Sequence, residues 1–230
     1  IAGDGVEALQ LVRSHVPDII VSDVMMPRMN GYKLCKTIKE DINISHIPVI
    51  LLTARDDRQS QISGYKNGAD GYLSKPFEVE MLMELIRNRL KNREYTKKRY
   101  LNAGLIPTPE ESTISLTDET FLIKLNSIIQ ENIENSNLGI QFICQEVGLG
   151  RSSLYNKLKA LTGMGANEYI SKLRIEKAIT LISGTDMPFS EIAEKTGFTT
   201  PSYFSTAFKQ YTGETPSQYK ERKKKGLADK

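Results

Sequence analysis

The second half of the chain contains a duplicated segment, and this internal repeat constrains the fold more than any other feature. Ile143 and Gly148 recur 49 residues later as Ile192 and Gly197. A further set recurs after 50 residues, in which Leu154, Leu158, Gly163 and Tyr169 correspond to Phe204, Phe208, Gly213 and Tyr219. Each copy reads as a helix, a glycine-containing turn and a second helix, so the sequence predicts two helix-turn-helix units.

The second helix of each copy is predicted to bury its apolar positions and to leave a polar outer face. Short hydrogen-bonding groups on such a face can reach base edges in a major groove, while lysines further along suit phosphates. The candidate DNA-binding residues are Arg151, Ser152, Tyr155, Asn156, Lys159, Ser202, Tyr203, Thr206 and Lys209. A helical pattern over 167–183 is expected to hold the two units about one DNA turn apart, ~34 Å.

This half resembles the AraC/XylS-type DNA-binding domain from about Thr117 to Arg222. The resemblance rests on SSLYNKLKALTG, RIEKAITLI, SEIAEKTGF and SYFSTAFKQYTGETPSQY. It implies double-stranded promoter DNA as a partner, but it does not give the base sequence that is read. Residues 151–230 carry 14 basic and 8 acidic side chains, which suits a polyanion, although a solvated lysine-rich tail contributes to this excess.

Short apolar runs alternate with helical patterns in the first half, which predicts a parallel sheet covered on both faces. The runs cover 18–23, 47–53 and 71–74, and the helical patterns cover 3–16, 31–40, 58–67 and 78–90. Asp23 and Thr53 end the first two runs, and Lys75 follows the third. Ligands bind at the carboxyl ends of such strands, so a carboxylate, a hydroxyl and an ammonium are expected to form a phosphoryl-transfer site.

These residues resemble the receiver domains of two-component response regulators. The matching motifs are SDVMMPRMNG around Asp23, Thr53-Ala54, DGY before the lysine, and Lys75-Pro76-Phe77. The resemblance implies that a histidine kinase phosphorylates Asp23, that Thr53 and Lys75 contact the phosphate, and that Tyr72 rotates inward as a switch. It also implies a cis Lys75–Pro76 bond. The alternatives are a helix-capping Thr53 and a Tyr72 that is simply a half-buried strand aromatic.

The beginning of the chain departs from the receiver pattern. Receivers of this family start with a strand that ends in two adjacent acids, which help to hold Mg²⁺, whereas Ile1–Gly5 resembles the end of the second strand. Asp4 is not a substitute, because it lies in the turn before a helix. With Asp23 as the remaining carboxylate for an octahedral ion, Mg²⁺ binding and phosphorylation are expected to be weak. The open edge of 19–21 is expected to be covered by another chain or to be poorly ordered.

The expected fold class is α/β, a partial flavodoxin-like parallel sheet of a truncated receiver, followed by an all-α double helix-turn-helix domain. The expected boundaries are 1–91 for the receiver, 92–117 for a helical extension and linker, 118–222 for the DNA-binding domain and 223–230 for a basic tail. Asp118 is expected to cap a helix over 118–134. Cys35 and Cys144 are expected to be small buried thiols in a reducing cytosol rather than a disulfide.

The predicted function is a non-enzymatic transcription regulator that phosphorylation of Asp23 controls. Its kinase is expected upstream in the same polypeptide or in a separate protein, and we expect a cytoplasmic homodimer without direct membrane contact. One alternative is a constitutive DNA-binding protein whose receiver remnant only dimerises. Another is a phosphatase-like enzyme with Asp23 as the nucleophile, which is disfavoured because such enzymes place a second Asp where this chain has Met25.

Overall fold

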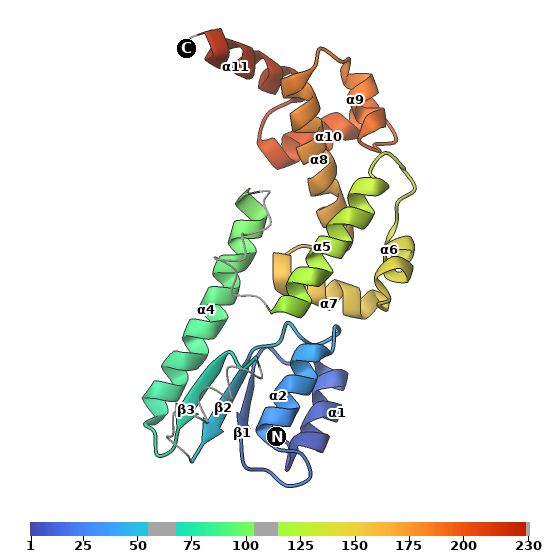
Figure 1. Cartoon of the computed structure of the whole chain (residues 1–230). Helices are drawn as coiled ribbons and strands as arrows, with labels where there is room; N and C mark the ends of the chain where they lie inside the picture. Colours follow the sequence, from blue (N-terminus) through green and yellow to red (C-terminus); the bar gives the residue numbers. More distant parts are fainter. Residues whose placement is uncertain (55–67, 104–114, 229–230) are drawn as a thin grey trace. The chain divides into compact units, whose positions relative to one another are not determined.

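The structure is a computed structural model that describes residues 1–54, 68–103 and 115–228 (Figure 1). The chain forms two compact units. Unit 1 contains Ile1–Leu122 and Ser152–Gly163, and unit 2 contains Ile123–Arg151 and Met164–Lys230. No described helix is both long enough and apolar enough to cross a bilayer.

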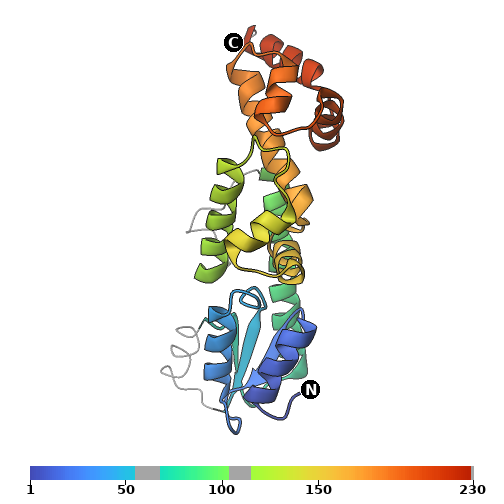
Figure 2. The ribbon, with the colours of Figure 1, turned by 90° about the vertical axis from the view of Figure 1, so that its right-hand side faces the viewer.

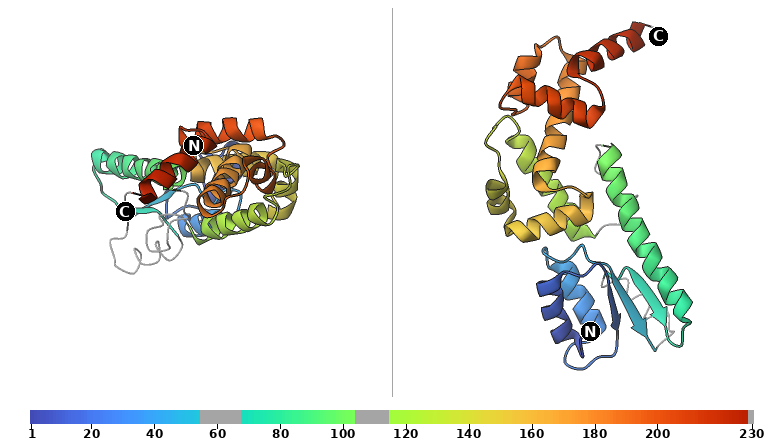
Figure 3. Two further views of the ribbon diagram at one scale, coloured as in Figure 1. Left: turned by 90° about the horizontal axis from the view of Figure 1, so that it is seen from above. Right: turned by 180° about the vertical axis from the view of Figure 1, so that it is seen from behind.

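Unit 1 is built on a parallel sheet with the strand order β1-β2-β3. The strands are β1 (Ile20–Asp23), β2 (Val49–Thr53) and β3 (Gly71–Ser74). Helices α1 (Gly5–His15) and α2 (Gly31–Glu40) lie on one face of this sheet, and α4 (Val79–Ala103) lies on the other (Figures 1 and 3). Burial on both faces explains why β2 is apolar almost throughout. The predicted layered α/β arrangement is confirmed.

The unit 1 core forms where α1 and α2 contact the sheet. Leu34, Cys35 and Ile38 of α2 are fully buried there, together with Leu51 of β2. Cys35 and Cys144 are both free thiols, as predicted, but only Cys35 is buried, whereas Cys144 is half-buried. Burial raises the pKa of Cys35 to about 12. At the edge of the described sheet, β1 exposes part of Val21, but whether another chain covers this edge stays a prediction.

The structure describes part of the region in which the domain boundary is expected. The helical extension is present, because α4 continues to Ala103. The helix expected at 58–67, and most of the linker expected before 117, lie outside the described residues. Unit 1 also includes Ser152–Gly163 from the second half of the chain. The expected domain boundaries stay a prediction.

The remaining helices carry the duplicated segment (Figure 2). They are α5 (Leu116–Glu131), α6 (Ile140–Val147), α7 (Arg151–Thr162), α8 (Ala166–Gly184), α9 (Phe189–Lys195), α10 (Pro201–Thr212) and α11 (Pro216–Ala228). The continuous helix predicted over 167–183 is therefore present as α8. The core of unit 2 is aromatic: Phe208 packs against Phe204 and Tyr219 with ring centroids 5.7 and 5.6 Å apart.

The duplication of the sequence is repeated in the backbone. Gly148 and Gly197 end α6 and the α9 turn with φ of 72° and 71°, and Gly163 and Gly213 end α7 and α10 with φ of 76° and 84°. These left-handed conformations favour glycine, because a Cβ clashes with the backbone there. At Gly197 an added Cβ would also lie 2.2 Å from the carbonyl oxygen of Ile133. The two helix–turn–helix copies thus close with matching turns.

Candidate functional site

Asp23 and Lys75 meet at the carboxyl end of the sheet. The Lys75 ammonium donates to Asp23 Oδ2, while the amide of Met25 donates to Oδ1 at 3.0 Å. The Lys75–Pro76 bond is cis, as expected. Partial burial acts to raise the pKa of Asp23, but the hydrogen bonds from Lys75 and Met25 hold it below its usual value. Asp23 is therefore a carboxylate at neutral pH, as a nucleophilic oxygen requires.

The structure places the other two predicted receiver residues on the neighbouring strands. Thr53 is buried at the end of β2, and its carbonyl oxygen accepts from the Lys75 amide at 2.6 Å. Tyr72 on β3 packs against the core on the α2 side of the sheet, and its hydroxyl lies 3.3 Å from that of Tyr32. The structure thus joins Asp23 to Lys75 directly, whereas the switch roles of Thr53 and Tyr72 stay predictions.

Gly31 is a positioning residue that the sequence reasoning did not single out for its packing. A Cβ at Gly31 would lie 2.3 Å from the Asp23 carbonyl oxygen, and the Gly31 amide donates to the Val24 carbonyl at 3.0 Å. The first residue of α2 therefore packs directly on the chain that follows β1. This close approach explains the glycine in the motif SDVMMPRMNG and fixes the backbone that presents Asp23.

The described residues do not fit a magnesium site. Mg²⁺ prefers near-octahedral oxygen ligands, and no cluster of three or more His, Cys, Asp or Glu side chains in the described ranges is arranged to hold a metal. Asp4 caps α1 by accepting from the amides of Val6 and Glu7 at 2.8 and 3.1 Å, and it also pairs with Arg28. The expectation of weak Mg²⁺ binding stays a prediction.

The candidate DNA-binding side chains lie on exposed faces of their helices. Among those predicted on α7, Asn156 is half-buried and the other four, Arg151, Ser152, Tyr155 and Lys159, are exposed. All four on α10 are exposed, namely Ser202, Tyr203, Thr206 and Lys209. The apolar positions of the same two helices are buried, as predicted: Leu154 and Leu158 on α7, and Phe204 and Phe208 on α10. Each helix therefore has a polar face available for base edges and phosphates.

Lys157 is a buried charge that the sequence reasoning missed. Its side chain is 0% exposed, and its ammonium pairs with Asp118 and donates to Ser45 Oγ at 2.8 Å. Ser45 Oγ in turn donates to Asp118 Oδ1 at 2.7 Å. Burial acts to raise the pKa of Asp118, but the charge of Lys157 lowers it, so the carboxylate stays ionised. The duplication holds a signal for this site, because the second copy has Ala207 at the equivalent position.

The expected capping role of Asp118 is wrong. Helix α5 begins at Leu116, so Asp118 lies inside its first turn, and the Ser115 hydroxyl accepts from the Asp118 amide at 3.2 Å. The Asp118 carboxylate instead accepts hydrogen bonds from the Lys157 ammonium and the Ser45 hydroxyl. Helix propensity alone does not reveal this role, because an acid in the first turn suits the helix dipole with or without a partner.

Comparisons with known proteins identify two regions. Residues 1–87 match the family described as the response regulator receiver domain, and residues 143–222 match the family described as a helix-turn-helix domain. The chain is 42% identical over 221 residues to a protein of Formosa agariphila named histidine kinase P4. That match covers 96% of this chain but only 16% of the length of the relative.

Two further proteins are matched over most of their own length. The probable transcriptional regulator ycf29 of Pyropia yezoensis is 31% identical over 179 residues, which cover 73% of this chain and 81% of that protein. Among solved structures, the C-terminal domain of AraT, a response regulator from Geobacillus stearothermophilus, is 31% identical. It covers 44% of this chain and 84% of that chain, with a TM-score of 0.42.

Proposed function

Because the chain belongs to the response regulators, and joins a receiver domain to an AraC-type helix-turn-helix DNA-binding domain, we propose that phosphorylation of Asp23 controls its binding to promoter DNA. The observation that carries this proposal is the contact of Lys75 with Asp23 at the end of parallel strands. It supplies an ionised nucleophile and, beside it, a cation for the charge that phosphorylation adds.

The proposed reaction is transfer of a phosphoryl group from a phosphohistidine of a kinase. An Asp23 oxygen attacks phosphorus, so that an O–P bond forms while the P–N bond breaks. The histidine keeps the electron pair of that bond and takes up a proton. Lys75 then pairs with a phosphate oxygen, and the buried Thr53 hydroxyl donates to another as it turns toward the group. Tyr72 moves inward in the same transition and leaves Tyr32.

The kinase is proposed to precede this receiver in the same polypeptide. The 42% identity to a much longer protein that is itself named a histidine kinase supports this arrangement. A receiver tethered to its kinase meets the phosphohistidine at a high effective concentration, which favours rapid transfer. The alternative is a separate kinase, and phosphotransfer measured at increasing dilution of the full polypeptide distinguishes the two, because only intramolecular transfer is independent of concentration.

The chain is proposed to act as a homodimer through α4. This helix exposes the apolar side chains of Val79 and Met83, which are four positions apart and share one face. Exposed apolar side chains that lie close together on one element are typical of interaction sites. Light scattering after gel filtration is expected to show a dimer that Met83→Asp converts to a monomer, while Leu116→Asp, an exposed apolar site on α5, leaves it intact.

The proposed regulator does not itself turn over a substrate. An aspartyl nucleophile that turns over needs a nearby general acid, and the side chain two residues after Asp23 is that of Met25. Release of inorganic phosphate from a small phosphodonor is therefore expected to be slow and stoichiometric. Continuous turnover that depends on Asp23 contradicts this part of the proposal.

The test compares DNA affinity with and without phosphorylation. A random duplex library first yields the preferred DNA sequence, and its Kd is then measured with and without a small phosphodonor in Mg²⁺ buffer. Labelling of Asp23 is expected to be slow, so affinity is compared on the labelled fraction. Labelled wild type is expected to bind about fivefold more tightly or better, and Asp23→Asn treated in the same way is expected to show no change. Glu40→Gln, an exposed carboxylate on α2, is the matched control. Equal affinity in all conditions, despite labelled Asp23, identifies a constitutive DNA-binding protein instead.

A further inference from the structure

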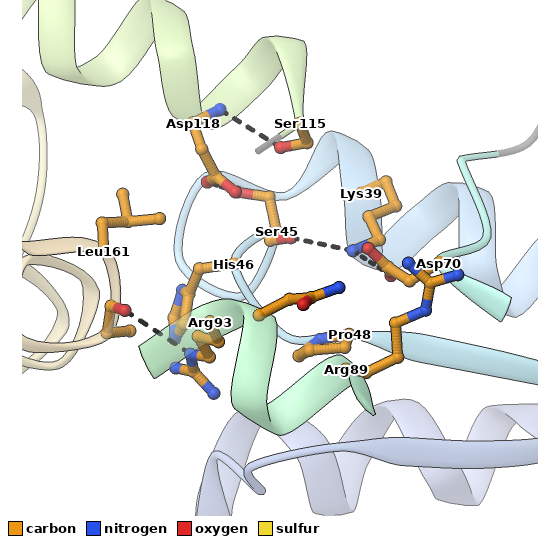
Figure 4. Close-up of a pocket in the computed structure, with 12 residues that line it drawn as sticks. Lys39, Ser45, His46, Pro48, Asp70, Arg89, Arg93, Ser115, Asp118 and Leu161 are labelled. Atoms are coloured by element: carbon orange, nitrogen blue, oxygen red, sulfur yellow. Dashed lines mark hydrogen bonds and ion pairs between the residues drawn. The ribbon is translucent and has the colours of Figure 1, made fainter. Parts of the chain in front are cut away.

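A cavity of about 70 Å³ lies within unit 1, between the loop at 41–48, α4, the first turn of α5 and the end of α7 (Figure 4). Its charged and titratable lining residues are Lys39, His46, Asp70, Arg89, Arg93 and Asp118. A single buried water needs only about 10–15 Å³ of such space, so the cavity has room for a multi-atom ligand. None of these six residues takes part in the phosphoacceptor site or in the candidate DNA-binding faces.

The acids in this lining already have partners. Lys39 pairs with Asp70 at 2.7 Å, and Lys157 pairs with Asp118. The Lys39 ammonium is held further by the carbonyl oxygens of Ser45 and Ile47 at 3.3 and 2.9 Å. These two carboxylates are therefore not available to neutralise additional cations in the cavity.

Arg89 and Arg93 supply a positive charge that the described residues leave largely unmatched. They are four positions apart on α4 and thus share one helix face. Arg89 has no ion-pair partner among the described residues, and Arg93 approaches Asp18 only at 3.9 Å, where the Asp18 side chain is 92% exposed. Arg93 donates from Nη1 to the Asp18 carbonyl oxygen at 3.1 Å and weakly from Nε to the Ala160 carbonyl oxygen at 3.5 Å, and neither acceptor carries a charge. Both arginines are half-buried, and cations withdrawn from water normally have a close anion, so this lining calls for one.

Two buried nitrogen atoms also lack a hydrogen-bond partner. They are Nε of Arg89 and Nδ1 of His46, whose residue is only 7% exposed. Burial, together with the positive charge of Lys157, lowers the pKa of His46 to about 3, so the ring is neutral and carries one N–H. Unsatisfied buried polar atoms are rare in native proteins and point to a missing partner. Figure 4 shows His46 entering from the loop and both arginines from α4.

We propose that this cavity binds a small tetrahedral oxyanion of the phosphate class. Arg89 and Arg93 supply two positive charges on planar N–H donors that suit such an anion, and His46 supplies a further N–H. Ordered water satisfies the nitrogen atoms but leaves the charge unmatched. The loop at 41–48, α4 and α7 all contribute to the lining of the cavity. A bound anion therefore connects these three parts of unit 1.

The test is a titration of the full chain with inorganic phosphate at constant ionic strength. The Lys75→Gln background removes the strand-end cation as a competitor for phosphate, and chloride is the reference salt. Calorimetry is expected to show one saturable site for phosphate and a weaker response to chloride. Arg89→Gln and Arg93→Gln are each expected to weaken phosphate binding at least about tenfold, because each removes a charged hydrogen bond.

Two controls separate binding from misfolding. Arg87→Gln changes an arginine on the same helix whose side chain is 66% exposed, and it is expected to leave phosphate affinity within about twofold. Without phosphate, Arg89→Gln is expected to melt at the wild-type temperature or above it, because it removes an unmatched cation. Phosphate is expected to stabilise the wild type and Arg87→Gln to a similar degree and Arg89→Gln much less. Absence of saturable phosphate binding, or equal affinity in Arg89→Gln and Arg87→Gln, overturns the proposal.

Discussion

The Lys157 ammonium lies 2.8 Å from the Ser45 hydroxyl, although 112 positions separate the two residues in the chain. Asp118 binds both groups and completes a buried polar cluster within unit 1. Lys157 belongs to α7, whose outer face carries candidate DNA-binding residues, and Ser45 belongs to the loop that leads into β2. Through Ser45, this cluster connects the loop before β2 with α7, the helix that carries the first set of candidate DNA-binding residues.

Removing one partner of this cluster is expected to destabilise the chain strongly. Lys157→Ala leaves the Asp118 carboxylate buried without its cation, which typically costs about 3–5 kcal/mol of the free energy of unfolding. Urea denaturation followed by circular dichroism measures the loss. The double variant Lys157→Met/Asp118→Leu is expected to recover much of it, since no charge then remains buried. A loss below about 1 kcal/mol in Lys157→Ala shows instead that water reaches Asp118.

His46 is expected to make stability depend on pH. Its pKa is about 3 in the folded chain and 6.5 when unperturbed, so between these values the unfolded state binds one more proton. The stabilisation is complete above pH 6.5 and is lost as the pH falls through that window, by about 2 kcal/mol at pH 5. Denaturation in phosphate-free buffer at pH 7 and pH 5 measures this slope.

His15 provides the control for this pH dependence, because it is the second of two histidines and is exposed. His46→Gln is expected to flatten the decrease between pH 7 and pH 5, whereas His15→Gln is expected to retain it. An unchanged slope in His46→Gln assigns the pH dependence to the carboxylates.

Gly31 is expected to be intolerant of any side chain. The Cβ of Gly31→Ala would lie 2.3 Å from the Asp23 carbonyl oxygen, so the backbone on one side has to move, at about 1–3 kcal/mol. The same movement displaces Asp23 from Lys75, so labelling by a phosphodonor is expected to slow. Gly150→Ala is the control, because nothing lies within 4 Å of its added Cβ. Equal labelling rates in both variants refute the positioning role.

Asn156 is expected to read one base pair. An amide on a recognition helix can pair with adenine, so Asn156→Ala is expected to weaken binding by ~1–3 kcal/mol and to relax preference at one position of the selected DNA sequence. Repeating the library selection with the variant measures this. Gln130→Ala, an exposed amide on α5, is expected to leave the preference unchanged. An unaltered base preference in Asn156→Ala indicates a structural role for this half-buried residue.

The sequence was most informative where a pattern is periodic or repeated. Short apolar runs predicted the three strands. The equivalence of Gly148 with Gly197 predicted two matching glycine-containing turns, and the structure shows that both glycines are left-handed. The approach of Lys75 to Asp23 was predictable as well, because parallel strands carry their ends to one edge.

The buried polar cluster was not predictable in the same way. Whether Asp118 caps a helix or pairs with a distant lysine depends on which surfaces meet, and no local rule specifies that. The same holds for Arg89 and Arg93, whose four-residue spacing is typical of a solvated helix face. Long-range packing buries Lys157 and Asp118 completely and withdraws Arg89 and Arg93 partly from water.

The exposed faces of α7 and α10 have an evolutionary consequence. Side chains such as Ser202 and Thr206 lie outside the aromatic core that Phe204, Phe208 and Tyr219 form, so replacing them leaves the hydrophobic interior intact. If these side chains contact DNA as proposed, single substitutions after gene duplication can change the DNA sequence that is bound. The folded core then needs no compensating substitution.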